Sequence, residues 1–224
     1  MQTPRIDKLI RSARKSVGLS VTQQGLLVVR APKRVPLSAI EDAVREKADW
    51  ILKKQGESRT RLLRFPLHTY TEGEHFLFLG ENLMLHYSEN ANKVFSSGGV
   101  LFVPMKKRES AKKAVEAWYK ERARAYFEER LGYFSQRMGV SYASLRLSSA
   151  ITRWGSCGPE GSINLVWRLV AAPKELVDYV VVHELAHLRR RDHSAAFWAE
   201  VACVLPDYKA RRKALHEYAP LLSR

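Results

Sequence analysis

Four side chains near the C-terminus have the types and spacing of a catalytic metal centre. In the stretch VVVHELAHLRRRDHS, His183 and His187 are four residues apart, Glu184 follows the first, and His193 lies six residues beyond the second. Residues i and i+4 lie on the same face of a helix, so both imidazoles can bind one ion. Glu184 is rotated by roughly 100° from His183, which suits a general base better than a ligand.

Three neutral histidines with one open position are typical of a catalytic zinc site, where the bound water has its pKa lowered to about 7. The sequence therefore predicts Zn²⁺ bound by His183, His187 and His193, with Glu184 as catalytic base. His193 can swing back to the ion after a short loop, and Glu200 is the reserve third ligand. Two histidines satisfied in a core, a structural zinc and another divalent metal remain alternatives.

The elements that position these residues are a helix and a hairpin. Pro173 can open the helix, because its missing N–H costs little in the first turn. Residues 146–170 are typical of a hairpin closed around CGPEGS (157–162). Its second strand, 162–169, has the alternation either of a core strand or of an edge strand that binds an extended peptide.

Several further side chains near this hairpin could assist a reaction. Candidates for stabilising an oxyanion are Arg153, Arg168 and Tyr179. Asp192 could orient a histidine or could simply form a turn. Cys157 could be a fourth ligand, although a small turn or core residue is the simpler interpretation.

The remaining patterns predict an α+β fold with two parts. Residues 1–105 contain short strand patterns and one amphipathic helix, with residues 56–64 as a polar connector. Residues 106–224 contain a long helical stretch, the hairpin and three more helices. We expect a small β-rich N-terminal region (1–105), then a zincin-like helical domain (106–224) whose HExxH helix lies beside the hairpin.

Composition limits the class of protein. The net charge is +15, and residues 1–64 carry 15 Lys and Arg against 6 Asp and Glu. A polyanion or nucleic acid is therefore a possible partner, although basic charge alone defines no specific site. The sequence has no secretory signal, no membrane span and only two cysteines, so we expect a cytoplasmic protein that makes no membrane contact. The oligomeric state is not predicted.

The motif HELAHLRRRDH has the metzincin spacing, but Arg190 replaces the metzincin glycine, and no methionine follows for a Met-turn. Together with RWGSCGPEGSINLVWRLVAAP (153–173) and DHSAAFW (192–198), it resembles the YgjP-like metallopeptidases, relatives of the SprT-like and WLM zinc peptidases. The resemblance implies zinc on His183, His187 and His193, with Glu184 as base. Departures from the family pattern, which bear on substrate preference, are Gly158 for serine, Val166 for asparagine and Asp192 for asparagine.

The expected function is that of a zinc-dependent metallohydrolase, most simply a metallopeptidase that cleaves peptide bonds in peptide or protein substrates. One alternative is a metal-dependent nucleoside triphosphate (UTP) pyrophosphatase, a label that some YgjP-like proteins carry. Others are a DNA-associated SprT-like protease and an inactive zinc-binding module. The sequence lacks the GxxxxGK[ST] phosphate loop.

Overall fold

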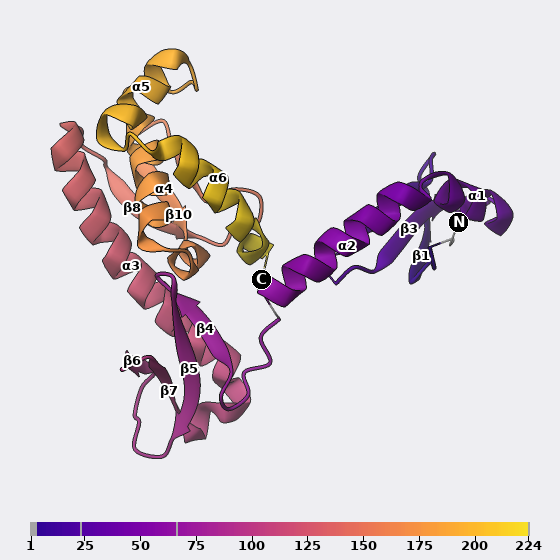
Figure 1. The fold of residues 1–224 in the computed structure, drawn as a ribbon, viewed down its shortest axis with the longest axis horizontal. Coiled ribbons are helices and arrows are strands. Elements are labelled where there is room, and N and C mark those ends of the chain that lie inside the picture. The colour runs from indigo at the N-terminus through magenta and orange to yellow at the C-terminus, as the bar shows by residue number, and fades with distance from the viewer. Residues whose placement is uncertain (1–3, 23, 66, 224) are drawn as a thin grey trace. The chain divides into compact units, whose positions relative to one another are not determined.

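The computed structural model describes residues 4–22, 24–65 and 67–223, which form an α+β fold (Figure 1). The chain divides into two compact units, Met1–Leu67 and His68–Arg224. The boundary that we expected between residues 105 and 106 lies inside the second unit. The physical reason is that strands between residues 75 and 104 share one hydrophobic core with the helices that follow them.

The N-terminal unit is a three-stranded sheet with two helices. Its elements are β1 (Lys8–Ser12), β2 (Gly18–Val21), β3 (Leu27–Pro32), α1 (Leu37–Glu46) and α2 (Ala48–Arg64). The strand order is β1-β3-β2, with β3 parallel to β1 and antiparallel to β2. Gly25, at a φ of 80°, lies in the turn between β2 and β3. The buried apolar side chains of β3, α1 and α2 form the core of this unit.

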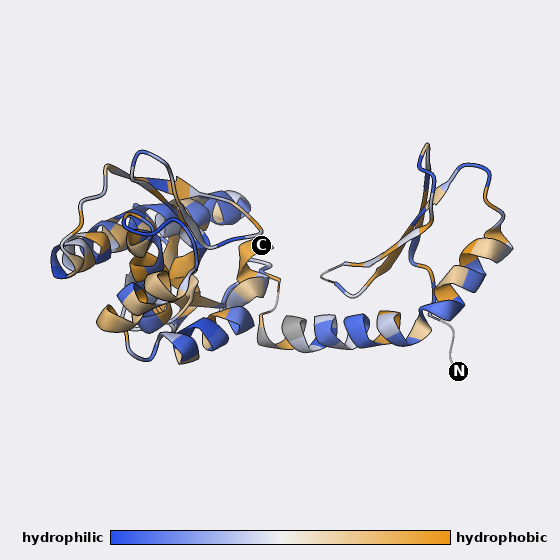
Figure 2. Ribbon diagram, turned by 90° about the horizontal axis from the view of Figure 1, so that it is seen from above, coloured by the Kyte–Doolittle hydropathy of each residue, from blue (hydrophilic) through white to orange (hydrophobic). Residues whose placement is uncertain are grey.

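The polar stretch 56–64 is helical, contrary to the connector that we expected. Tertiary hydrogen bonds hold α2 in place here: Gln55 Nε2 donates to the Gly25 carbonyl (2.9 Å), and Ser58 Oγ donates to the Thr22 carbonyl (3.3 Å). Both helices of the unit carry a mixture of hydrophilic and hydrophobic residues along their length (Figure 2), as amphipathic helices do. Packing of one face thus extends the helix beyond what its local composition indicates.

The second unit contains two sheets and four α-helices among its described residues. The elements of the first sheet are β4 (His75–Phe78), β5 (Glu81–Ser88), β6 (Phe95–Ser97) and β7 (Val100–Pro104), in the order β4-β5-β7-β6. The second sheet comprises β8 (Ser144–Ser148), β9 (Gly155–Cys157) and β10 (Ser162–Val166). The helices are α3 (Ala111–Met138), α4 (Lys174–Ala186), α5 (Ala195–Val204) and α6 (Tyr208–Tyr218).

Short 3₁₀ segments, Met105–Ser110, Trp167–Ala171 and Ala219–Ser223, complete the unit. Within the described residues, no helix is both long and apolar enough to cross a membrane.

Helix α4 contacts both α3 and α6 and forms the centre of this unit (Figure 1). Its apolar side chains are buried on nearly every face. A bidentate ion pair joins it to α3, since Arg130 Nε and Nη2 donate to the two Asp178 carboxylate oxygens at 2.7 and 2.9 Å. Because both side chains are mostly shielded from water, this pair fixes the rotation of α4 against α3.

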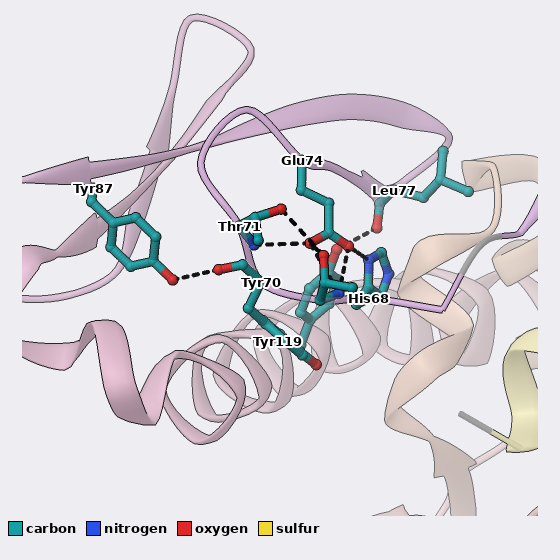
Figure 3. A network of polar contacts seen from close by, with 8 residues as sticks. His68, Tyr70, Thr71, Glu74, Leu77, Tyr87 and Tyr119 are labelled. Atoms are coloured by element: carbon teal, nitrogen blue, oxygen red, sulfur yellow. Dashed lines mark hydrogen bonds and ion pairs between the residues drawn. The ribbon is translucent and has the colours of Figure 1, made fainter.

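The start of the second unit is held by the carboxylate of Glu74 (Figure 3). It accepts hydrogen bonds from His68 Nδ1 (2.7 Å), from the backbone N–H groups of Thr69 and Thr71 (both 3.1 Å) and from Thr69 Oγ1 (3.1 Å). Tyr70 has a positive φ of 58°. Its carbonyl accepts a hydrogen bond from the phenol oxygen of Tyr87, Oη, at 2.7 Å. This network fixes residues 68–74 against the first sheet.

The small sheet β8-β10-β9 decides between two interpretations of one strand. The strand that we expected at 162–169, either in the core or at a sheet edge, is β10, which ends at Val166 and lies in the middle of the sheet. It pairs in parallel with β8 and antiparallel with β9. The edge strand beside α4 is therefore β9. A parallel partner 18 residues earlier in the chain (Ser144 with Ser162) leaves no local signal in the sequence of β10.

Candidate metal centre

Helix α4 forms although it contains three consecutive valines, which have low helix propensity. Pro173 precedes it, as expected, and Glu175 in the first turn favours the positive end of the helix dipole. The valines, Val180 to Val182, are buried in the core. Burial of a helix that is apolar on nearly all sides thus outweighs local propensity and places the motif inside the unit.

The helix ends at His187, its C-cap, and arginines fix the loop that follows. Arg189 donates to the Met138 carbonyl at the end of α3 and forms an ion pair with Glu200 of α5 (2.7 Å). Arg191 donates to the Pro159 carbonyl in the β9–β10 turn. These contacts hold the basic loop next to the site.

The structure brings the three predicted histidines together. One ring nitrogen from each of His183, His187 and His193 lies within 4.8 Å of the others. The Nε2 atoms of His183 and His193 are 3.2 Å apart. Two nitrogens that bind one tetrahedral zinc at 2.0–2.1 Å are separated by about 3.4 Å, so the cluster has the dimensions of a metal site.

The protonation states of the histidines also suit a cation. His187 Nδ1 lies 2.9 Å from the Arg190 carbonyl, which can only accept, so Nδ1 carries the proton and Nε2 keeps its lone pair. Burial, His187, His193 and Arg212 together lower the pKa of His183 to about 3. Burial likewise lowers the pKa of His187. Both rings are therefore neutral near pH 7, as metal ligands must be.

Glu184 is buried, with 5% of its surface exposed. Burial raises its pKa to about 8, and the positive charge of Arg153 opposes this shift. Strand β9 lies directly against it: a Cβ added to Gly155 would be 2.6 Å from Glu184 Oε1. Glycine at this position therefore makes room for the carboxylate, and this requirement of the WGSC motif was not predicted from the sequence.

Other predicted residues separate into two groups. Arg153 acts on Glu184 through its charge, and the Tyr179 ring lies 5.9 Å from the His183 ring. Arg168 instead lies over the Trp167 ring, 4.3 Å from its centre. Burial lowers the pKa of Arg168, and the charges that oppose this are those of Glu116 and Tyr70. It is therefore not grouped with the histidines.

The reserve and orienting residues have other partners. Glu200 forms the ion pair with Arg189, and the Asp192 carboxylate accepts from Ser194 Oγ at 2.8 Å, as a turn residue does. The half-buried Cys157 thiol lies 3.6 Å from the Gly158 carbonyl. In the described part of the chain, the converging set of ligand atoms consists of the three histidines.

One neighbour of the site, Arg212, was missed by the sequence analysis. Its guanidinium lies 4.9 Å from the centre of the Trp198 ring, and that ring is 5.8 Å from the rings of both His183 and His193. Arg212 lies on α6, the second helix after α4 in the chain. Its one local signal is the i+4 spacing from Tyr208, which stacks on Trp198 at 5.2 Å.

The site thus combines three converging imidazoles, an adjacent buried carboxylate and a neighbouring edge strand, which are features of a metal-dependent hydrolase. A model of the YgjP-like metallopeptidase domain matches residues 15–218. This range covers most of the chain, so the chain belongs to the YgjP-like family of metallopeptidases. It is therefore a member of a hydrolase family whose substrates are peptides or proteins.

Other comparisons add little. No curated protein matches the chain. Among solved structures, the crystal structure of the metallopeptidase zymogen of Pyrococcus abyssi abylysin is similar to part of it, with 25% sequence identity and a TM-score of 0.38. That similarity covers 40% of this chain and 90% of the other chain.

Proposed function

We propose that this protein is a zinc-dependent metallopeptidase with a zincin-like site, in which His183, His187 and His193 bind the metal and Glu184 is the general base. The observation that carries the proposal is the convergence of three imidazole nitrogens within 4.8 Å beside a buried carboxylate. When bound, zinc would supply the Lewis acidity that activates water and polarises the substrate carbonyl.

Glu184 moves the proton in this reaction. Its carboxylate accepts a proton from the attacking water and passes it to the leaving amine. In the metal-free protein burial holds its pKa at about 8, and a divalent cation nearby would lower that value. Glu184 would then be ionised, and thus able to accept a proton, at neutral pH.

The free edge of β9 supports a peptide as the substrate. Gly158 N–H donates to the Ser162 carbonyl and Val166 N–H donates to the Trp154 carbonyl, both at 2.8 Å. Because an antiparallel ladder alternates, the backbone groups of Gly155 and Cys157 then point away from β10, toward the open edge. An extended peptide could add there as a further strand, next to Glu184.

The test is a paired assay on zinc-loaded wild type and Glu184→Gln. Each protein is offered an unfolded protein and UTP, and peptides and pyrophosphate are measured separately. We expect peptide release by the wild type, at least a hundredfold less by the variant, and equal zinc content by elemental analysis. Zinc loss in Glu184→Gln would contradict the base assignment, because the metal would then depend on Glu184.

The same assay tests the alternative reaction. Release of pyrophosphate that depends on Glu184, without release of peptides, would refute the peptidase proposal and assign the site to nucleotides. A His183→Ala variant serves as the metal-free control, since it should lose zinc and turnover together.

A further inference from the structure

A polar pocket lies on the face of the small sheet that points away from the core. Its cavity measures about 190 Å³, and the lining includes Ser148, Arg153, Ser156 and Asn164. Ile163 and Leu165 of β10 are buried in the core, so Asn164 between them faces the opposite side of the sheet. Ser156 is its partner on β9 and shares that side.

The pocket is lined by polar side chains that hold one another in place and by one cationic side chain, Arg153. Asn164 Nδ2 donates to the carbonyl and to the Oγ of Ser156, both at 3.3 Å, which holds the amide in place. Arg153 is exposed, and it forms no hydrogen bond or ion pair with another described residue. No acidic side chain is among the residues that line the pocket. The pocket therefore offers a positive charge that no carboxylate of its own lining neutralises, although the same charge also acts on Glu184.

The pocket is one strand away from the proposed catalytic base. Gly155 lines the pocket and also approaches Glu184 from the other side of β9. The side chains of an extended peptide point alternately to the two faces of a sheet. A peptide added to the edge of β9 would therefore direct every second side chain toward the face that carries Arg153, Ser156 and Asn164.

We propose that this pocket is a specificity subsite for an acidic side chain, Asp or Glu, of the peptide substrate. Arg153 pairs with the carboxylate, and the Ser156 hydroxyl donates a hydrogen bond to it. The inference rests on the proposed peptidase function, because it takes the peptide to lie along β9. An arginine–carboxylate pair is among the stronger polar contacts available for such selection.

The probes are two pools of extended peptides, one containing Asp and Glu and the other containing Asn and Gln at the same positions. The zinc-loaded wild type cleaves each pool, and the product peptides are sequenced by mass spectrometry. We expect Asp or Glu to be enriched at one fixed distance from the cleaved bond, with kcat/KM at least about tenfold higher than for the matched amide. A tenfold ratio corresponds to about 1.4 kcal/mol.

Arg153→Gln should bring this ratio close to one, and Arg153→Glu should invert it in favour of the matched amide, because the new carboxylate repels an acidic side chain. The ratio is the decisive quantity, because any effect of Arg153 on Glu184 acts on both peptides equally. Arg146 is the matched control. It is exposed, it lies on β8 opposite Asn164 in the strand register, and it does not line the pocket. Arg146→Gln should keep the wild-type ratio.

Binding to zinc-loaded Glu184→Gln, measured by fluorescence anisotropy, separates this inference from the proposed function. Tighter binding of the acidic pool that is lost with Arg153→Gln would support the subsite even without any hydrolysis. Equal binding and equal cleavage of both pools would overturn the subsite and leave the peptidase intact. If Arg146→Gln and Arg153→Gln reduced the ratio equally, general basic charge would be the cause and the inference would fail.

Discussion

Replacing Gly155 by alanine tests whether the position of the Glu184 carboxylate controls the reaction. The new Cβ would lie 2.6 Å from Glu184 Oε1, 2.8 Å from Cγ and 2.9 Å from Cδ. Ordinary contacts begin near 3.4 Å, so the carboxylate or β9 must move by about 0.8 Å. The φ of Gly155 is not in the positive range, so backbone strain adds nothing to this effect.

The expected loss follows from that displacement. A misplacement of about 1 Å can lower a rate by about 10²-fold, which corresponds to about 2.7 kcal/mol in the barrier. Overpacking of a buried contact also destabilises the fold, by about 1–3 kcal/mol. Zinc content should not change, because all three proposed ligands remain.

The measurement is kcat and KM on a peptide substrate, with zinc per chain and urea unfolding on the same samples. Gly132→Ala in α3 is the control, since no atom within 4 Å would meet its Cβ. It should keep wild-type kcat and gain up to about 1 kcal/mol of stability. Wild-type kcat in Gly155→Ala would refute the reasoning. Loss of zinc would also contradict it, because the ligands rather than the base would then be disturbed.

Two further predictions concern the contacts that hold the second unit together. Burial raises the pKa of Glu74, but hydrogen bonds from His68, Thr71 and Thr69 outweigh it and lower the pKa below 4.5. Glu74→Gln should therefore cost about 1–3 kcal/mol at pH 7. That difference should shrink as the pH falls from 4.5 through the lowered pKa, because the wild type then loses its charge-dependent stability; a constant difference in urea unfolding would contradict this. Asp178→Asn breaks the shielded pair with Arg130 and should cost about 1–3 kcal/mol, whereas Asp42→Asn, in a pair whose side chains are 65% and 68% exposed, should cost under about 1 kcal/mol. Equal losses in the two variants would show that shielding is not the cause.

Local patterns in the sequence were enough to predict the helix that carries the motif. Pro173, the apolar run and the i+4 histidines are all signals within a few residues, and the structure has α4 where they indicate. The hairpin formed by β9 and β10 was also predicted, because its turn residues are local. The convergence of His193 with the other two histidines agrees with the expected geometry, while its role as a ligand stays a prediction.

The features that were missed depend on contacts between distant parts of the chain. The parallel pairing of β8 with β10, which makes β10 a central strand, decided between the core and edge interpretations that the sequence left open. The strands before residue 105 join the core of α3, so the division of the chain lies near residue 67. Arg212 reaches the site through Trp198, and neither residue signals the other in the sequence. In each case tertiary packing, which a linear pattern does not contain, decided the outcome.

The environment of Glu184 argues against a core of histidines that simply satisfy one another. A buried carboxylate needs a nearby positive charge or a proton. The histidines do not supply the charge, because burial and their neighbours hold the pKa of His183 at about 3 and lower that of His187. Arg153 reduces the cost for Glu184 only in part, because the pKa remains at about 8. Without a cation Glu184 therefore keeps its proton at neutral pH. A divalent cation at the point where the imidazole lone pairs converge would stabilise the ionised carboxylate, which the neutral rings of His183 and His187 cannot do.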